Sequence, residues 1–279
     1  MANYTVADIQ ALRDRTGAGM LDVKKALEEA GGDQDKAADI LRIKGLKGVS
    51  KREGRSASEG LVAADVREEG SGQVGTLVEL NSETDFVAKS DKFTTLAEKV
   101  LAAVVEAGAA SAEDALAAPL DSRTVEDVVN EAAGVLGEKL VLRRVARVEA
   151  PKVSVYLHKT NQDLPPQVGV LVGSDEKAAE AAHDVALHIA AYSPLYLSRD
   201  DVPADVVEHE RQVAEETSKA EGKPEAALPK IVEGRLNGFF KENVLLDQAY
   251  AKDPKTTVEK VVAATGGAVT AFARFRVGA

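Results

Sequence analysis

Two copies of one short apolar segment lie 94 residues apart in this chain: Gln73-Val74-Gly75-Thr76-Leu77-Val78 and Gln167-Val168-Gly169-Val170-Leu171-Val172. Each copy is preceded by a stretch typical of a β-strand, at 60–66 in the first case and at 153–158 in the second. Two strands that follow each other closely predict a hairpin in each half of the chain. The repeat therefore indicates that one structural unit has been duplicated.

A helical pattern follows each copy of the segment. Apolar side chains recur at helical spacing over 93–107 in the first half and over 176–192 in the second. Two units of β-hairpin and helix predict an α+β fold, with antiparallel sheets in two related core subdomains that pack together. We place these subdomains at 61–150 and 151–279, with a long strand at 140–149 as the bridge between them.

The composition excludes several classes of site. The chain has 279 residues, enough for about two domains, and no cysteine, which excludes disulfides, thiolate metal sites and cysteine nucleophiles. Its formal net charge is −11 and aromatic residues make up only 4%, so we expect no direct contact with nucleic acid. No apolar run reaches ~18 residues, and the N-terminus lacks a basic segment followed by a long apolar one. We therefore expect a cytoplasmic protein that makes no contact with a membrane.

The first 45 residues predict a separate unit of three short helices. A capping box of Thr5 and Asp8 opens the first helix. The glycine pair 31–32 ends the second helix, and Gly45 ends the third. A unit of this size has a thin core and no room for a buried cleft, so we interpret 1–45 as a docking module.

Residues 46–60 join this module to the core and are rich in glycine and in basic side chains, namely Lys47, Lys51, Arg52 and Arg55. Residues 1–60 carry 11 Lys/Arg and 10 Asp/Glu, so the negative excess of the chain lies beyond residue 60. A short segment of this kind predicts a solvated, flexible linker. The alternative is a basic strip for RNA or for an acidic partner, although the cluster is short and has no interleaved aromatic residues.

The first half of the repeat has about ten additional residues, at 81–91, between its second strand and its helix. An insertion in one copy of a duplicated scaffold usually forms a surface loop, where functional residues concentrate. This loop contains the triplet Asp85-Phe86-Val87 among charged residues. A phenylalanine on a polar loop either turns back into the core or contacts a partner, and spacing alone favours the core.

Two further helical segments, 204–222 and 228–243, meet at Gly222-Lys223-Pro224. They predict an antiparallel helical hairpin at about 204–243, inserted into the second core subdomain. The first arm is highly charged and poor in large apolar residues, so we expect the hairpin to protrude into solvent. Its arms either pack only on each other or grip a partner or a second copy of the chain.

No constellation of catalytic residues is visible. His183 and His188 are five residues apart on a predicted helix, about 140° around its axis, so they cannot bind one metal ion from a single face. Residues 70–75 match the dinucleotide-binding spacing, but they precede a strand instead of a helix and so fit a hairpin turn. The chain has no phosphate-binding loop, metalloprotease motif or nucleophile elbow. The sequence predicts no catalytic residue, no metal site and no cofactor.

Four stretches of the chain resemble one known family. Residues 13–27 (RDRTGAGMLDVKKAL) are similar to the N-terminal signature of the bacterial translation elongation factor Ts family, and residues 81–88 (NSETDFVA) are similar to its second signature. Residues 232–235 (VEGR) in the predicted hairpin and 275–278 (FRVG) near the end of the chain also resemble family segments. The resemblance runs through the whole chain in order and agrees with the layout predicted from its patterns.

Proteins of this family are nucleotide-exchange factors for elongation factor Tu, the GTPase that carries aminoacyl-tRNA to the ribosome. The resemblance implies that this chain binds elongation factor Tu in its GDP form and promotes GDP release, with no bond-making chemistry of its own. It also implies that the three-helix module is UBA-like (ubiquitin-associated) and docks on the GTPase domain. The residues that match docking positions are Arg13, Met20, Leu21, Lys24, Leu136 and His158.

The resemblance assigns a role to the inserted loop as well. Thr84, Asp85, Phe86 and Val87 match the segment that disturbs the Mg²⁺ and phosphate site of the GTPase. For Phe86 the resemblance favours a partner contact, whereas spacing alone favours the core. Our hypothesis is that the Phe86 ring wedges apart the elements that hold Mg²⁺ and the phosphates, while Asp85 supplies a competing carboxylate or hydrogen-bond acceptor.

Two other functions remain open at the level of the sequence. An RNA-associated adaptor would use the N-terminal module and the basic residues of 46–60, whereas an enzyme would have its site between the duplicated subdomains. The helical hairpin also leaves open a homodimer, or a complex with two copies of each protein.

Overall fold

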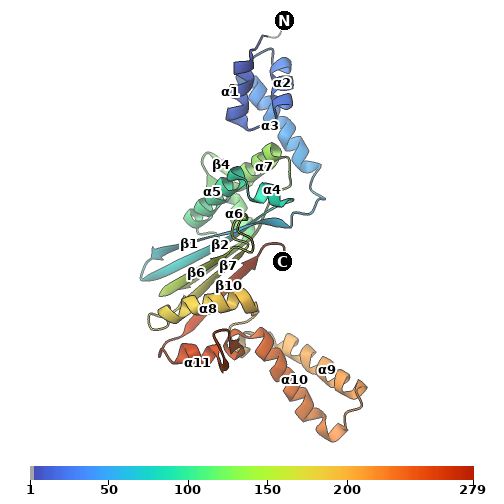
Figure 1. Ribbon diagram of the computed structural model, residues 1–279, viewed down its shortest axis with the longest axis vertical. Helices are drawn as coiled ribbons and strands as arrows, with labels where there is room; N and C mark the ends of the chain where they lie inside the picture. The colour runs from blue at the N-terminus through green and yellow to red at the C-terminus, as the bar shows by residue number, and fades with distance from the viewer. Residues whose placement is uncertain (1–2) are drawn as a thin grey trace.

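The computed structural model describes residues 3–279 and shows an elongated molecule with three parts (Figure 1). A three-helix module lies at one end, a layered core of sheets and helices in the middle, and a helical hairpin at the other end. The α+β class predicted from the sequence is confirmed. Among the helices formed by the described residues, none combines the length and the apolar composition that crossing a membrane requires.

Two three-stranded antiparallel sheets form the centre of the core. The first has the strand order β1-β2-β5 and the second has the order β10-β7-β6. The bounds of these strands are β1 Glu59–Glu69, β2 Gly72–Ser82, β5 Val141–Ala150, β6 Lys152–His158, β7 Val168–Ser174 and β10 Val269–Arg276. In each sheet the strand that carries the repeated segment is central and pairs with the strand before it, so the two halves have the same topology, as a duplicated unit would.

The two sheets pack face to face because glycine occupies the third position of both repeated segments. A Cβ atom on Gly75 would lie 2.9 Å from a methyl carbon of Leu171, and one on Gly169 would lie 3.1 Å from a methyl carbon of Leu77. The two leucines occupy the fifth positions of the copies, so each glycine receives the leucine of the other copy. A side chain at either glycine would force the sheets apart, because protein interiors are close-packed.

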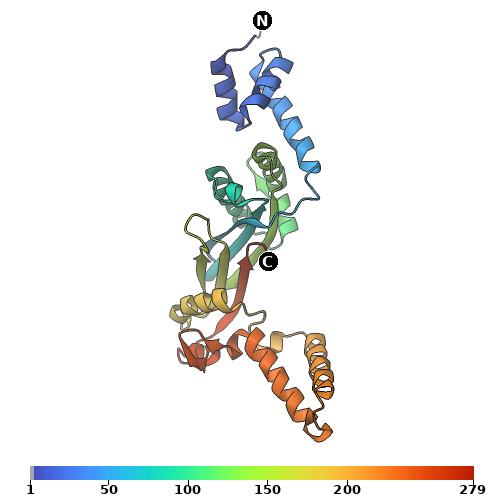
Figure 2. The same cartoon turned by 45° about the vertical axis from the view of Figure 1, so that its right-hand side comes forward.

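Helices cover the outer face of each sheet and give the core four layers (Figures 1 and 2). On the first sheet they are α5 Asp91–Ala107, α6 Ala112–Ala117 and α7 Val125–Leu136, and on the second α8 Ala179–Tyr192, with α11 Val258–Ala263 packed against α8. Successive side chains of a strand point to opposite faces, so Val78 and Leu80 pack against the first helical layer while Leu77 packs against the second sheet. Two short ribbons complete the core, β3 (Pro119–Leu120) with β4 (Arg123–Thr124) and β8 (Ala249–Tyr250) with β9 (Asp253–Thr257).

The chain crosses from the first sheet to the second at Pro151. The strand expected at 140–149 is β5, the third strand of the first sheet, and β6 of the second sheet begins one residue after Pro151. We keep residue 151 as the proposed boundary between the two core subdomains.

The N-terminal module consists of α1 (Val6–Thr16), α2 (Met20–Glu29) and α3 (Gln34–Ser50). The predicted capping box is present at the start of α1, where the Asp8 amide donates to the Thr5 hydroxyl and the Asp8 carboxylate accepts from the Thr5 amide. The module has its own small core, built on Leu12, Val23 and Leu27, which are fully buried.

The predicted end of the third helix at Gly45 is wrong, because α3 continues to Ser50. A Cβ atom on Gly45 would lie 3.2 Å from the Cα atom of Gly134 in α7, so the two glycines allow α3 and α7 to cross in contact. Gly45 therefore serves helix packing, although its residue type also suits a helix terminus. The interpretation of 46–60 as a flexible linker is wrong for 46–50, which are helical.

The remaining connection to β1 is also tied to the core. The Arg52 guanidinium donates to the carbonyl of Ala133, and the Arg55 guanidinium pairs with Glu83 at 3.3 Å. The Lys139 ammonium donates to the carbonyl of Arg55 at 3.0 Å. Of the four basic residues expected in a solvated linker, Arg52 and Arg55 thus have partners within the molecule.

The helical hairpin is formed by α9 (Ala204–Ala220) and α10 (Leu228–Asn243), as predicted, and it projects from the core (Figure 2). Short 3-10 turns precede the hairpin (η1 Arg199–Asp201), join its arms (η2 Glu225–Ala227) and follow it (η3 Leu245–Asp247). At its base the Arg199 guanidinium pairs with Asp247 at 2.7 Å and lies 4.6 Å from the centre of the Phe240 ring. These contacts fix the angle at which the hairpin leaves the core.

Candidate functional site

The inserted loop of the first half forms a single helical turn, α4 (Asp85–Ala88), between β2 and α5. The Thr84 hydroxyl caps this turn and accepts a hydrogen bond from the Val87 amide at 3.3 Å. Val87 packs against the core of the first subdomain and Ala88 is fully buried, whereas the Phe86 side chain is 73% exposed. The prediction from spacing alone, that Phe86 lies in the core, is wrong.

A carboxylate that the sequence analysis did not identify holds this turn in place. Glu138, just beyond α7, accepts hydrogen bonds from the amides of Glu83 and Thr84 at 3.1 and 3.0 Å and from the Thr84 hydroxyl. Charge-assisted hydrogen bonds to backbone amides are about twice as strong as neutral ones. No local motif reveals Glu138 in the sequence, because its partners lie more than fifty residues away.

Glu83 makes the reciprocal contact. Its carboxylate accepts from the Lys139 amide at 2.6 Å and pairs with the Arg55 guanidinium. The Lys139 amide, and then Arg55, hold the pKa of Glu83 below its ordinary value. Glu83 and Glu138 thus join the segment before α4 to the segment after α7, so the exposed ring stands on a braced support.

Asp85 and Phe86 share one lysine at the surface. The Lys89 ammonium lies 3.4 Å from the Asp85 carboxylate and 4.5 Å from the centre of the Phe86 ring. All three side chains reach solvent. Exposed ion pairs and exposed cation–π contacts stabilise by only about 1 kcal/mol or less, so a partner can displace this lysine at small cost.

The docking residues proposed for the N-terminal module lie at its surface. Arg13 is in the last turns of α1, and Met20, Leu21 and Lys24 are in the first turns of α2. Met20 is 60% exposed and Leu21 is 64% exposed, two consecutive large apolar residues in the first turn of a short helix. Adjacent exposed apolar side chains rimmed by basic ones are typical of a protein-binding surface.

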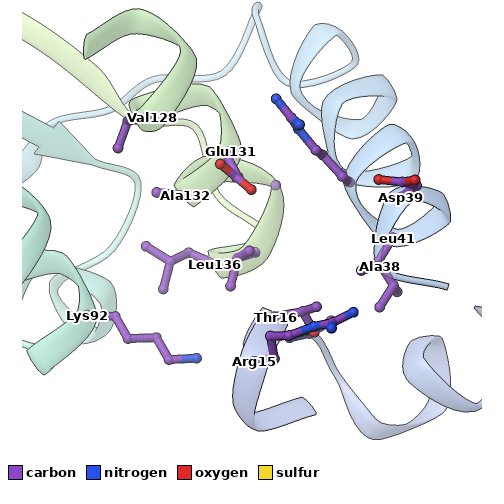
Figure 3. Close-up of a pocket in the computed structure, with 15 residues that line it drawn as sticks. Arg15, Thr16, Ala38, Asp39, Leu41, Lys92, Val128, Glu131, Ala132 and Leu136 are labelled. Carbon is purple, nitrogen blue, oxygen red and sulfur yellow. Dashed lines mark hydrogen bonds between the residues drawn. The ribbon is translucent and has the colours of Figure 1, made fainter. Parts of the chain in front are cut away.

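Leu136, the last residue of α7, is half-buried in a crevice between the module and the core (Figure 3). This crevice has a volume of about 450 Å³ and is lined by α1, α3, α5 and α7. The Lys92 ammonium of α5 reaches across it to within 3.4 Å of the Gly17 carbonyl in the loop after α1. The crevice places Leu136 opposite the module instead of on the outer surface.

His158, the last residue of β6, is exposed, and its Nδ1 shares a hydrogen bond of 2.9 Å with the Tyr156 hydroxyl. The His158 carbonyl accepts from the amide of Gln167, and the neighbouring Pro166 carbonyl accepts from the amide of Val62 near the start of β1. That end of β1 pairs with the end of β2 that leads into α4. His158 and the α4 turn therefore lie at the same end of the two packed sheets.

The predicted residues thus form two groups. The α4 turn and His158 share one end of the core, while Arg13, Met20, Leu21 and Lys24 lie on the module, with Leu136 in the crevice between the two parts. Within residues 3–279, no three His, Asp or Glu side chains are arranged to hold a metal ion. The arrangement presents two separate groups of exposed side chains, one of which includes an aromatic ring on a braced turn.

Comparison with known proteins identifies the relatives of this chain. Residues 83–279 match the family model described as "Elongation factor TS". A protein named "Elongation factor Ts" from Beutenbergia cavernae is 64% identical over 281 aligned residues, with both chains covered in full. Proteins of the same name from an Arthrobacter species and from Clavibacter michiganensis subsp. michiganensis are 63% and 58% identical, again over the full length of both chains.

Proposed function

Because the chain belongs to the elongation factor Ts family, we propose that it binds elongation factor Tu in its GDP form and accelerates GDP release in the cytoplasm. In translation elongation this role is nucleotide exchange, which makes and breaks no covalent bond. The finer mechanism proposed here is a mechanical one, in which the α4 turn enters the Mg²⁺ and phosphate site of the GTPase.

Exchange of this kind depends on differential binding. The protein must bind nucleotide-free elongation factor Tu more tightly than the nucleotide-bound form, and by reciprocity it weakens nucleotide binding by the same factor. Each tenfold change requires about 1.4 kcal/mol of contacts that form only in the nucleotide-free complex. A mechanism therefore needs a group that gains contacts as the nucleotide site opens.

The observation that carries the proposal is the 73% exposure of Phe86 on a braced turn. Burying a phenylalanine side chain contributes about 1.5–3 kcal/mol, which corresponds to roughly one to two powers of ten in affinity. The hydrogen bonds of Thr84 and Glu138 hold the turn before the partner arrives, so little ordering entropy is lost on insertion. Asp85 then lies beside the ring as a competing carboxylate, and Val87 anchors the turn to the core.

The remaining assigned residues hold the two proteins together in this proposal. Met20 and Leu21 supply an apolar contact to the GTPase domain, with Arg13 and Lys24 as its basic rim. Leu136 and His158 contribute from the core.

Release of a fluorescent GDP from elongation factor Tu, followed by stopped flow, tests the proposal. Addition of this protein should raise the release rate at fixed Mg²⁺, with saturation as its concentration increases. The matched control is His209→Ala, which changes an exposed side chain on α9 of the distal hairpin, outside its groove, and should leave the acceleration intact. A release rate that does not depend on this protein would contradict the proposal.

The RNA-adaptor alternative depends on the basic residues of 46–60, and of these Arg52 and Arg55 have partners within the molecule. Its test is binding of tRNA over a range of salt concentration. Tight binding whose affinity falls steeply with salt would favour the adaptor, because each phosphate contact releases counterions.

We propose further that the hairpin provides the contact to a second copy. A groove of about 300 Å³ on the hairpin lies between α9 and α10 and includes Val213 and Phe239. Sedimentation equilibrium should give the mass of two chains, and Val213→Glu should reduce it to the mass of one chain. A single-chain mass for the unmodified protein at every concentration would contradict this assignment.

A further inference from the structure

The last strand of the second sheet has an open edge. In the order β10-β7-β6, β10 bonds β7 on one side, and no strand formed by residues 3–279 pairs with its other side. Figure 2 shows β10 at the margin of the layered core, with the C-terminus at its end. Exposed strand edges present unpaired amides and carbonyls, and they are the usual site at which another segment is added to a sheet.

The hydrogen bonds at the end of β10 identify which of its residues face outward. The amide of Val277 donates toward the second sheet, to the Gln167 carbonyl at 2.9 Å. The carbonyl of Arg276 instead accepts from the Arg144 guanidinium at 2.9 Å. In an antiparallel strand the amide and carbonyl of one residue point to the same side, and this side alternates along the strand. Arg274 and Phe272 therefore also direct their backbone groups outward.

These outward groups face a groove of about 630 Å³. One wall is β10 over residues 270–274, and the other is the segment 193–197 that follows α8. Leu195 in that second wall is 65% exposed. The groove thus combines a line of backbone donors and acceptors with an apolar contact, as an extended peptide requires.

Two arginines, Arg144 and Arg274, and one aspartate, Asp201, line the groove. Across the described residues, neither Arg274 nor Arg276 has a carboxylate within 4 Å. The Arg274 Nε is buried and has no hydrogen-bond partner, while its Nη2 donates to the Ala190 carbonyl at the end of α8. Burial, and then the neighbouring charges of Arg276 and Arg144, lower the pKa of Arg274.

Among the described residues, the carboxylates near the groove contact groups other than Arg274. The Asp201 carboxylate accepts from the amide and hydroxyl of Ser198 at 2.8 and 2.6 Å. Glu79, which is fully buried, pairs with the Arg144 guanidinium. The guanidinium of Arg274 therefore lacks a counter-charge that an incoming carboxylate can supply.

We propose that the open edge of β10 binds an extended acidic segment of a partner protein, which adds to the second sheet as a fourth strand. The same edge of a second copy does not fit, because β10 contains two arginines and no carboxylate that could pair with Arg274. The proposal does not depend on nucleotide exchange or on Phe86.

The first test uses a labelled hexapeptide probe of alternating Glu and Val and a matched probe of alternating Lys and Val, with the full chain. Fluorescence anisotropy should show binding of the Glu probe and none of the Lys probe. Amide hydrogen exchange should be fast at Phe272 and Arg274 in the free protein and about tenfold slower with the Glu probe bound. Slow exchange of these two amides in the free protein would show a closed edge and overturn the proposal.

The second test separates this site from general electrostatics. Arg274→Gln should weaken the Glu probe about tenfold, since a charge-assisted hydrogen bond is lost, while Arg211→Gln on the hairpin should have no effect. Arg274→Lys keeps the positive charge and should retain most of the binding. Retained binding in this variant shows that the loss in Arg274→Gln comes from the missing charge and not from misfolding. Equal binding of both probes, competition by polyuridylate, or self-association of the free protein through this edge would each overturn the proposal.

Discussion

The neighbours of Phe86 in the α4 turn determine whether its side chain faces the core or the solvent. Within the α4 turn, Val87 and Ala88 take the inward positions, so the ring between the capping Thr84 and Val87 points to solvent. Spacing along the chain contains no information on which member of a one-turn helix faces inward. The resemblance to a family signature indicated that Phe86 faces a partner, which requires an exposed side chain. In the structure the Phe86 side chain is exposed.

Loss of the Glu138 carboxylate should loosen this turn. Glu138→Ala leaves two backbone amides and one hydroxyl without their acceptor, and a loss of about 1–3 kcal/mol in the free energy of unfolding is expected. Urea denaturation measures this loss, and amide exchange should become faster at Thr84. The control is Glu126→Ala, an exposed carboxylate on α7. Equal stability of the two variants would show that the brace contributes nothing.

Burial of His188 should make stability depend on pH. The ring is 1% exposed; its Nδ1 accepts from the Ala251 amide and its Nε2 donates to the Gln248 carbonyl oxygen. Burial lowers its pKa below the ordinary 6.5, so the unfolded chain takes up the proton first as the pH falls. Stability is then full above about pH 6.5 and is lost below it, by up to about 1.4 kcal/mol per pH unit.

Urea denaturation between pH 7.5 and 5 checks this expectation. His188→Gln should flatten the pH dependence, whereas His209→Gln, which changes an exposed histidine on α9, should leave it unchanged. If the free energy of unfolding depended on pH equally in the unmodified protein and in both variants, His188 would not be the source of that dependence.

At the scale of elements, the sequence predicts the hairpins of both sheets correctly, but it does not predict where α3 ends. The repeated segment predicts both hairpins and their helices, because period-2 and period-3.6 patterns are local. The end of α3 is different, since Gly45 has the residue type of a helix terminus but lies inside a helix. Its reason is a contact with Gly134, which is almost ninety residues away and leaves no local signal.

Two glycine substitutions should have opposite effects on the free energy of unfolding. A Cβ atom at Gly169 would lie 2.5 Å from Val62 and 3.1 Å from Leu77, so Gly169→Ala should destabilise by about 1–3 kcal/mol. A Cβ atom at Gly234, inside α10, would meet nothing within 4 Å, so Gly234→Ala should stabilise by roughly 0.5–1 kcal/mol. Both values come from urea denaturation, and a loss of stability in Gly234→Ala would contradict this view of the hairpin.

At the scale of the whole molecule, the elongated shape separates the two surfaces proposed to bind elongation factor Tu. The module presents Met20 and Leu21, the core presents the α4 turn, and the crossing of α3 with α7 sets the angle between them (Figure 1). The three-part layout was predictable from composition and periodicity. The crevice and the brace around α4 were not, because they depend on contacts between segments that are remote in the chain.

The module surface should control affinity without affecting folding. The double variant Met20→Ala/Leu21→Ala should weaken binding to nucleotide-free elongation factor Tu by roughly tenfold or more, as expected for two apolar contact residues. Isothermal titration calorimetry measures the affinity. Val6→Ala, at a side chain that is 79% exposed on the same module, is the control and should bind as the unmodified protein does. Unchanged affinity of the double variant would remove this surface from the interface.

The rate of GDP release from elongation factor Tu at a saturating concentration of Phe86→Ala tests the central claim most directly. If the ring opens the metal site, the rate should fall by roughly ten- to a hundredfold, with Phe86→Leu intermediate and an unchanged unfolding transition in both variants. A release rate equal to that of the unmodified protein would contradict the account.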